Sequence, residues 1–150
     1  MNSNDLKKSF RAKLAERACV GVFSKTTDSN IVEAAGYSGL DFIILDMEHG
    51  PATLEIVHNH VRASLVNNMF PIIRTKGVDA HSIGSALDTG ALGVQIPNIS
   101  TASQAREVVN AARFYPEGMR GVCRFVRAAN YGSMDKQIYF EQANQSLLNL

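Results

Sequence analysis

Three polar side chains that could carry acid–base chemistry follow a short apolar run. The run Phe42–Leu45 leads into Asp46, and Glu48 and His49 come next, before a Gly-Pro pair. A carboxylate beside an imidazole fixes the tautomer of the ring and stabilises its protonated form, so the imidazole can act as a general base at neutral pH. We therefore consider His49 a candidate base and Asp46 its orienting carboxylate. The alternatives are a histidine bonded to a backbone group and an aspartate that caps the loop.

Arg74 ends the next apolar run, Phe70–Ile73. Consecutive parallel strands are usually neighbours, so Arg74 is expected to open into the same mouth as His49. A guanidinium in that place suits a carboxylate or an enolate oxygen, which it can hold through two parallel hydrogen bonds. An ion pair between Arg74 and Asp46 or Glu48 is the competing interpretation, and one arginine can do both.

Arg120 lies in a turn-rich loop, Tyr115–Gly121, where Gly118 and Gly121 flank it closely. Glycines permit sharp backbone turns, so the loop predicts a side chain presented outward, and a surface turn is the simplest interpretation. The loop follows a helix, so simple topology puts Arg120 on the rim opposite the strand exits. Only a long excursion of the chain or a neighbouring subunit could bring it to a site at those exits.

The other residues that could bind metal or act as nucleophiles form weaker patterns. His58 and His60 are two positions apart, which places them on different faces of a helix and argues against a metal site. Cys19 and Cys123 lie in unrelated contexts, so neither a zinc site nor a disulfide framework is indicated. The sequence contains no glycine-rich phosphate loop and no Gly-x-Ser-x-Gly turn.

Composition restricts the class of protein. The chain has 150 residues, of which 45% are hydrophobic, and a formal net charge of +1. This size suits one domain with a real core, and the near-neutral charge gives no support for a nucleic-acid or membrane-surface partner. No apolar run is long enough to cross a membrane, and the first residues, Met1–Lys8, lack a secretory signal pattern, so we expect a cytoplasmic protein.

Apolar runs alternate with helical patterns along the chain. The clearest helix is Thr53–Asn67, in which leucine and valine recur every three or four residues. Strands are predicted at 19–24, 42–45, 70–75 and 92–97, with a fifth beginning at 147–150, and helices at 5–18, 28–36, 53–67, 79–90, 102–114 and 135–144.

Single helices between strands are typical of βα units, which form a parallel sheet with right-handed crossovers. We interpret residues 1–150 as one α/β domain in which residues 1–18 form an N-terminal helix. Four and a half units leave an open parallel edge, whereas a closed eight-stranded barrel takes about 250 residues. We therefore predict roughly the first half of a TIM (β/α)8 barrel, from the first strand to the start of the fifth.

Four stretches resemble the HpcH/HpaI aldolase family, the class II, metal-dependent aldolases that act on 2-keto acids. The first is the Asp-x-Glu-His signature at Asp46–His49, and the others lie in the order and spacing of the family. They are Pro71–Arg74, Leu87–Pro97 and Arg113–Gly121. Together they extend over most of the chain, which makes the resemblance specific.

The resemblance implies a TIM (β/α)8 barrel and reversible aldol cleavage of a 4-hydroxy-2-keto acid into pyruvate and an aldehyde. It implies a divalent metal, Mg²⁺ or Mn²⁺ with Co²⁺ as a further candidate, that stabilises the enolate. The family's metal ligands are a Glu at the end of the fifth strand and an Asp on the next, so we expect both beyond Leu150 and none within this chain. The expected partners are a small-molecule 2-keto acid and further copies of the chain in a homo-oligomer.

The resemblance also implies roles for individual residues. His49 would be the base that works with metal-bound water, supported by Asp46. Arg74 would bind the keto acid and stabilise the enolate, and Arg120 and Gly121 would help to bind substrate.

Two other hypotheses stay open. The first is an acyl-CoA lyase of the malyl or citryl type from the same superfamily, against which the lack of a basic nucleotide-binding segment argues weakly. The second is a non-catalytic, truncated chain that serves as an assembly module, which the missing metal ligands support. Metal binding by this chain would separate the second hypothesis from an aldolase.

Overall fold

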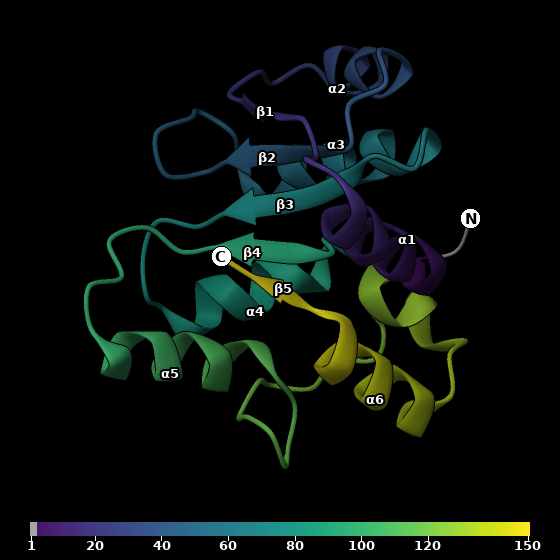
Figure 1. The fold of residues 1–150 in the computed structure, drawn as a ribbon. Helices are drawn as coiled ribbons and strands as arrows, with labels where there is room; N and C mark the ends of the chain where they lie inside the picture. Colours follow the sequence, from purple (N-terminus) through teal and green to yellow (C-terminus); the bar gives the residue numbers. More distant parts are fainter. Residues whose placement is uncertain (1–2) are drawn as a thin grey trace.

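A sheet of five parallel strands forms the centre of the computed structural model, which describes residues 3–150 (Figure 1). The strands lie side by side in chain order, which confirms the predicted parallel α/β arrangement. They are β1 (Gly21–Ser24), β2 (Phe42–Asp46), β3 (Phe70–Arg74), β4 (Gly93–Gln95) and β5 (Leu148–Asn149). The α-helices are α1 (Ser3–Glu16), α2 (Ser29–Tyr37), α3 (Leu54–Val66), α4 (Ala80–Asp88), α5 (Ala102–Ala112) and α6 (Lys136–Ser146).

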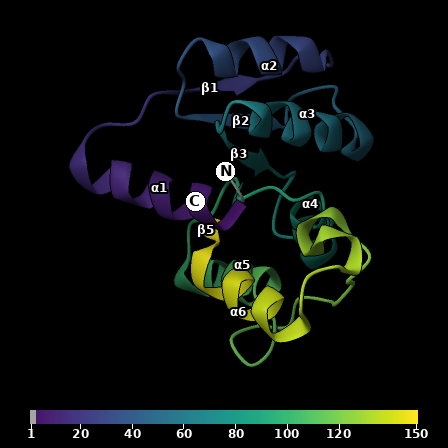
Figure 2. The same ribbon diagram turned by 90° about the vertical axis from the view of Figure 1, so that its right-hand side faces the viewer.

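Different helices cover the two faces of the sheet (Figure 2). α2 to α5 pack on one face, where alternate strand residues such as Ile43, Ile73 and Val94 form the main core. α1 packs on the other face, where the ring of Phe10 stacks on that of Phe70 with centroids 4.2 Å apart. The first face therefore corresponds to the outside of a barrel wall and the second to its inside.

The residues that end neighbouring strands stand in register at one edge of the sheet. Asp46 of β2 pairs with Arg74 of β3, and Arg74 pairs with Gln95 of β4. Residues in register point to the same face, so these three side chains share the face that α1 covers. The polar residues at the strand exits are therefore brought together by the sheet itself.

Polar caps explain where the helices begin. The side chain at each N-cap position accepts a hydrogen bond from a backbone N–H in the first turn of its helix, which satisfies a donor that the helix cannot. The caps are Asp28, Thr53, Asp79, Thr101 and Asp135, all at or next to predicted helix starts.

Two segments differ from their predictions. The N-terminal helix, predicted over residues 1–18, ends at Glu16. The first two residues of that prediction lie outside the described residues. Between the helices predicted at 102–114 and 135–144, where no element is predicted, lies a short 3₁₀ segment, Arg127–Gly132. Across the described residues, no helix is long and apolar enough to cross a membrane.

Candidate active site at the strand exits

A two-point ion pair joins Arg74 to Asp46. Arg74 donates from Nε to Oδ1 of Asp46 at 3.0 Å and from Nη2 to Oδ2 at 2.7 Å. The Asp46 side chain is 0% exposed and the Arg74 side chain 20% exposed. The hydrogen bonds from Arg74 lower the pKa of Asp46 to about 2, although burial of the carboxylate opposes this shift. Asp46 is therefore an anion that fixes the plane of the guanidinium.

Asp46 also shapes the loop that carries His49. Its Oδ1 accepts hydrogen bonds from the backbone N–H groups of Glu48 at 3.0 Å and of His49 at 3.2 Å. A Cβ at Gly50 would overlap the carbonyl oxygen of Asp46, so this tight turn needs glycine. The loop-capping alternative for Asp46 is thus present in the structure, and so is its ion pair with Arg74.

Glu48, rather than Asp46, is the carboxylate beside the imidazole. Its Oε1 lies 3.4 Å from Nε2 of His49, and its Oε2 lies 3.1 Å from Nη1 of Arg74. The structure thus corrects the expectation that the Asp46 carboxylate orients the ring, because backbone N–H groups and Arg74 occupy its oxygens. The imidazole itself is 64% exposed, so it can reach a ligand above the strand exits.

Arg74 keeps hydrogen-bonding capacity for a ligand. A guanidinium has five N–H donors, of which Asp46 takes two, and Nη1 forms an ion pair with Oε2 of Glu48 at 3.1 Å. One hydrogen on each Nη nitrogen remains. The ring of Phe23, 4.9 Å from Cζ, covers one face of the guanidinium and limits its movement. We call Asp46, Glu48, His49 and Arg74 the strand-exit group.

Sequence reasoning missed Lys25, Phe23 and the part played by Glu48. Nζ of Lys25 lies 3.9 Å from Oδ2 of Asp46, so a second cation stands at the same exit. The signal that could have found it is register: Ser24 pairs with Leu45, so Lys25 comes level with Asp46.

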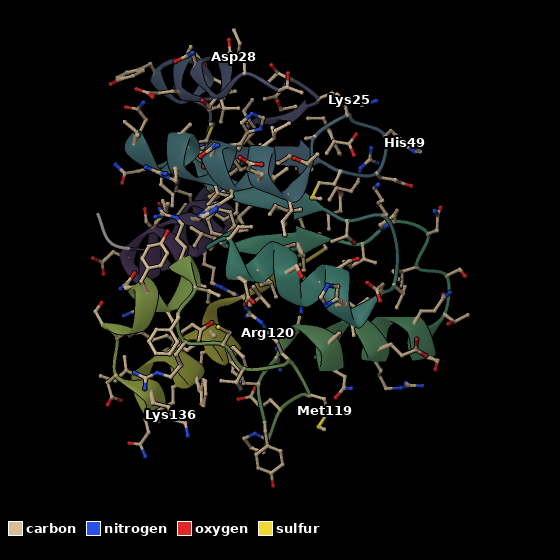
Figure 3. All side chains as sticks on the ribbon, turned by 180° about the vertical axis from the view of Figure 1, so that it is seen from behind. Lys25, Asp28, His49, Met119, Arg120 and Lys136 are labelled. Atoms are coloured by element: carbon tan, nitrogen blue, oxygen red, sulfur yellow. The ribbon has the colours of Figure 1, made fainter. Side chains whose placement is uncertain are left out.

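Arg120 lies far from the strand-exit group. It donates from Nη2 to Oδ1 of Asp88, the last residue of α4, at 2.6 Å. Figure 3 places Arg120 near the middle of the molecule and Lys25 and His49 together at one end. This agrees with the topological prediction of an opposite rim, since α4 runs from the strand exits back to the amino ends of the strands. The prediction of an outward side chain is wrong, because the Arg120 side chain is only 3% exposed.

Gly121 follows Arg120 in the same loop and is exposed. Neither residue joins the strand-exit group within one chain. Substrate binding by Arg120 and Gly121 therefore stays a prediction, which would need a site completed by another subunit.

The described residues do not fit a divalent metal. No group of three or more His, Cys, Asp or Glu side chains in residues 3–150 is placed to hold an ion. Asp46 and Glu48 are the carboxylates of the strand-exit group, but both bind Arg74, whose positive charge repels a cation.

The fold and the strand-exit group define a part of a (β/α)8 barrel with polar side chains at the carboxyl ends of its strands, where barrel enzymes hold their active sites. A family model described as HpcH/HpaI aldolase/citrate lyase matches residues 19–148. The chain belongs to this family.

Individual relatives agree with that assignment. The chain is 37% identical over 146 residues to a 2-keto-3-deoxy-L-rhamnonate aldolase of Salmonella typhi, a match that covers 97% of this chain and 53% of the relative. The chain thus spans about half the length of the curated relatives it matches.

Solved structures confirm the barrel fold. A family protein from Burkholderia cenocepacia J2315 has 29% identity and a TM-score of 0.85, over 97% of this chain and 58% of its own. An HpcH/HpaI aldolase from Desulfitobacterium hafniense DCB-2 has 25% identity and a TM-score of 0.81, over 92% of this chain and 54% of its own.

Proposed function

We propose that the whole protein is an aldolase that cleaves a 4-hydroxy-2-keto acid into pyruvate and an aldehyde, and that the strand-exit group belongs to its catalytic centre. Family membership supports carbon–carbon bond chemistry, and the relatives named 2-keto-3-deoxy-L-rhamnonate aldolase support a 2-keto-3-deoxy acid as substrate. One observation carries the proposal. The buried Asp46 holds the guanidinium of Arg74 near His49, and each Nη nitrogen of Arg74 keeps one N–H for a ligand.

The cleavage needs a base and a group that stabilises an enolate. The base removes the proton of the C4 hydroxyl, the C3–C4 bond breaks to release the aldehyde, and its electron pair passes to C3 to form the enolate of pyruvate. C3 then accepts a proton. We assign the removal of the hydroxyl proton to the imidazole of His49, whose Nε2 lies 3.4 Å from Oε1 of Glu48.

Arg74 supplies fixed positive charge to the keto acid. Its two remaining N–H donors can bind the substrate carboxylate or the enolate oxygen. Because Asp46 and Phe23 already fix the guanidinium, little reorganisation is needed when negative charge develops. Asp46 therefore acts as a positioning residue.

A divalent metal, Mg²⁺ or Mn²⁺, would supply Lewis-acid stabilisation of the enolate in such an aldolase. We assign its ligands to none of the described residues, and the Glu and Asp ligands on later strands stay a prediction. A homo-oligomer and a cytoplasmic location are likewise predictions.

A lyase or synthase acting on citrate or a related acyl-CoA ester is the second candidate. The family description includes citrate lyase, and the citrate synthase SbnG structure is 25% identical to this chain with a TM-score of 0.80. Both reactions pass through an enolate, so the two candidate functions must be distinguished by the substrate that the protein cleaves and not by the residues of the site.

Pyruvate release tests the proposal. The whole protein should release pyruvate from 2-keto-3-deoxy-L-rhamnonate, measured with lactate dehydrogenase, and should leave citryl-CoA intact. His49→Ala should lower kcat/KM by roughly 10²–10⁴-fold, the usual contribution of a general base. Arg62→Lys, an exposed arginine of α3, is the control. Cleavage of citryl-CoA alone would establish the second candidate, and full activity of His49→Ala would remove His49 from the mechanism.

A further inference from the structure

A cavity of about 460 Å³ lies at the amino ends of the strands, opposite the strand-exit group. It is bounded by α1, the end of α4, the 3₁₀ segment Arg127–Gly132 and α6. We call it the amino-end pocket. Its polar lining includes Lys7, Arg120, Arg127 and Tyr139, while Leu87 and Leu92 are among its apolar walls.

The lining of the amino-end pocket is strongly cationic. Lys7, Arg120 and Arg127 contribute three basic groups, and none of the described lining residues is acidic. Asp88 binds one Nη of Arg120 and offsets a single charge. Burial, followed by the nearby charges of Arg120 and Arg11, lowers the pKa of Lys7 to about 8. Like charges held together in this way favour an anion between them.

Three hydrogen-bond donors on residues that line the pocket are buried and have no partner among the described residues. Nε of Arg120, Nε of Arg127 and the hydroxyl of Tyr139 make no hydrogen bond in the described structure. Arg120 and Tyr139 are both more than nine-tenths buried. Buried donors are nearly always satisfied in folded proteins, and no acceptor among the described residues satisfies these three.

Packing holds these donors in place. The guanidinium of Arg120 lies over the ring of Phe114, with Cζ 4.6 Å from its centroid, and the Tyr139 ring packs 5.2 Å from the same centroid. Arg127 crosses the backbone at Gly90, where its Cγ would lie 3.2 Å from an added Cβ. Gly90 has a φ of +89°, which favours glycine, and its lack of a side chain leaves space for the side chain of Arg127 just after α4.

We propose that the amino-end pocket binds a small oxyanion, a phosphate or a carboxylate, between Lys7, Arg120 and Arg127. Charge-assisted hydrogen bonds from two arginines suit such a ligand, and the hydroxyl of Tyr139 can donate a further one. The leucine walls leave room for a short apolar group attached to the anion. The site is separate from the strand-exit group and does not depend on the aldolase reaction.

Titration of the protein with inorganic phosphate and with acetate, followed by calorimetry, tests this site. At least one anion should bind saturably, and the tighter one tells whether the natural ligand is a phosphate or a carboxylate. Arg127→Gln should weaken binding at least tenfold, and Tyr139→Phe, which keeps the ring packing, severalfold. Arg106→Gln, an exposed arginine of α5, should bind as the unchanged protein does.

A second readout reports on the pocket directly. The pKa of Lys7, followed by NMR of ¹³C-methylated lysines, should rise when the anion binds, because a nearby negative charge stabilises the ammonium. The proposal would be overturned if Arg127→Gln and Tyr139→Phe bound the anion as tightly as Arg106→Gln does. Failure of both anions to bind would overturn it as well, and if Arg127→Gln does not fold, Tyr139→Phe decides.

Discussion

The two ends of the sheet use arginine–aspartate pairs in opposite ways. At the carboxyl end the aspartate is the buried partner, and Arg74 extends to the strand exits. At the amino end the arginine is the buried partner, and the Asp88 side chain is 29% exposed. In the first pair a fixed carboxylate presents a cation to a ligand in the mouth of the barrel. In the second, the cation is enclosed in a pocket and its carboxylate faces outward.

This difference shows which charge of a pair is available for function. Asp46 uses its hydrogen bonds on Arg74 and on the loop of His49, so it positions other groups. Arg120 donates from one Nη to Asp88, and its buried Nε makes no hydrogen bond with the described residues. The ion pairs look alike in a contact map, but only burial tells the positioning residue from the binding residue.

Asp46→Asn should have the largest effect on stability. Removing one partner of a buried ion pair leaves the other charge uncompensated, and we expect the free energy of unfolding to fall by about 3 kcal/mol. Urea denaturation measures this loss. Asp28→Asn, at an exposed helix cap where asparagine serves equally well, should change stability little. Equal losses in both variants would mean that the Asp46–Arg74 pair is not special.

Acid should weaken the carboxyl end. The pKa of Asp46 is lowered to about 2 from an ordinary value of 3.8, so its stabilising effect is complete above about pH 4 and lost as the pH falls through 2. We expect this carboxylate to account for about 1–2 kcal/mol in that window. Unfolding free energies measured from pH 5 to pH 2 should fall less steeply in Asp46→Asn.

A remaining acid dependence is expected in that variant. The hydrogen bond from Arg17, followed by the backbone N–H of Val20, holds the pKa of Asp41 well below its usual range, although burial opposes the shift. An unchanged pH profile in Asp46→Asn would therefore show that Asp46 is not the source of the acid dependence.

Alkali should strengthen the amino end. The pKa of Lys7 is about 8 in the folded chain and 10.5 for the ordinary side chain, so the unfolded state binds more protons between these values and stability rises with pH. The rise should reach on the order of 1 kcal/mol by pH 10, after discounting for partial exposure. Above that pH, ionisation of Tyr139 opposes it, because burial raises the pKa of that hydroxyl. Lys7→Met should remove the rise, and its persistence would show that Lys7 is not its source.

Replacing either of two glycines in and just after α4 should have the smallest effect on stability, and the two variants form a matched pair. Gly90→Ala places a side chain at a φ of +89° and against Arg127, so we expect a loss of about 1 kcal/mol. Gly84→Ala, inside α4 with open space around it, should instead stabilise by about 0.5–1 kcal/mol. Urea denaturation of both variants gives the comparison, and a gain in Gly90→Ala would contradict the strained end of α4.

Local patterns predicted most of the fold and half of the candidate site. The run Phe42–Leu45, the helix after Thr53 and the shared exit of Asp46 and Arg74 follow from periodicity, caps and the parallel βα order. These features depend on neighbouring residues or neighbouring strands, which a sequence displays directly.

The remaining features depend on contacts between distant segments. Arg120 is buried because Asp88, 32 positions earlier, and Phe114 meet it from different elements. Two carboxylates precede His49 in the sequence, and only the turn closed at Gly50 decides that Glu48 faces the ring. The amino-end pocket needs α1 and α6 to pack together, which no local pattern indicates.

Exchange of the methyl protons of pyruvate in D₂O, followed by ¹H NMR, tests the central claim most directly because it requires the enolate but no aldehyde. The whole protein should catalyse this exchange. Arg74→Lys should slow it by roughly 10²-fold, since a lysine cannot keep the two-point pair with Asp46 and still donate to the enolate. Arg62→Lys should exchange at the normal rate. Exchange that is equally fast in Arg74→Lys and Arg62→Lys would contradict the assignment of the strand-exit group as the enolate-stabilising site.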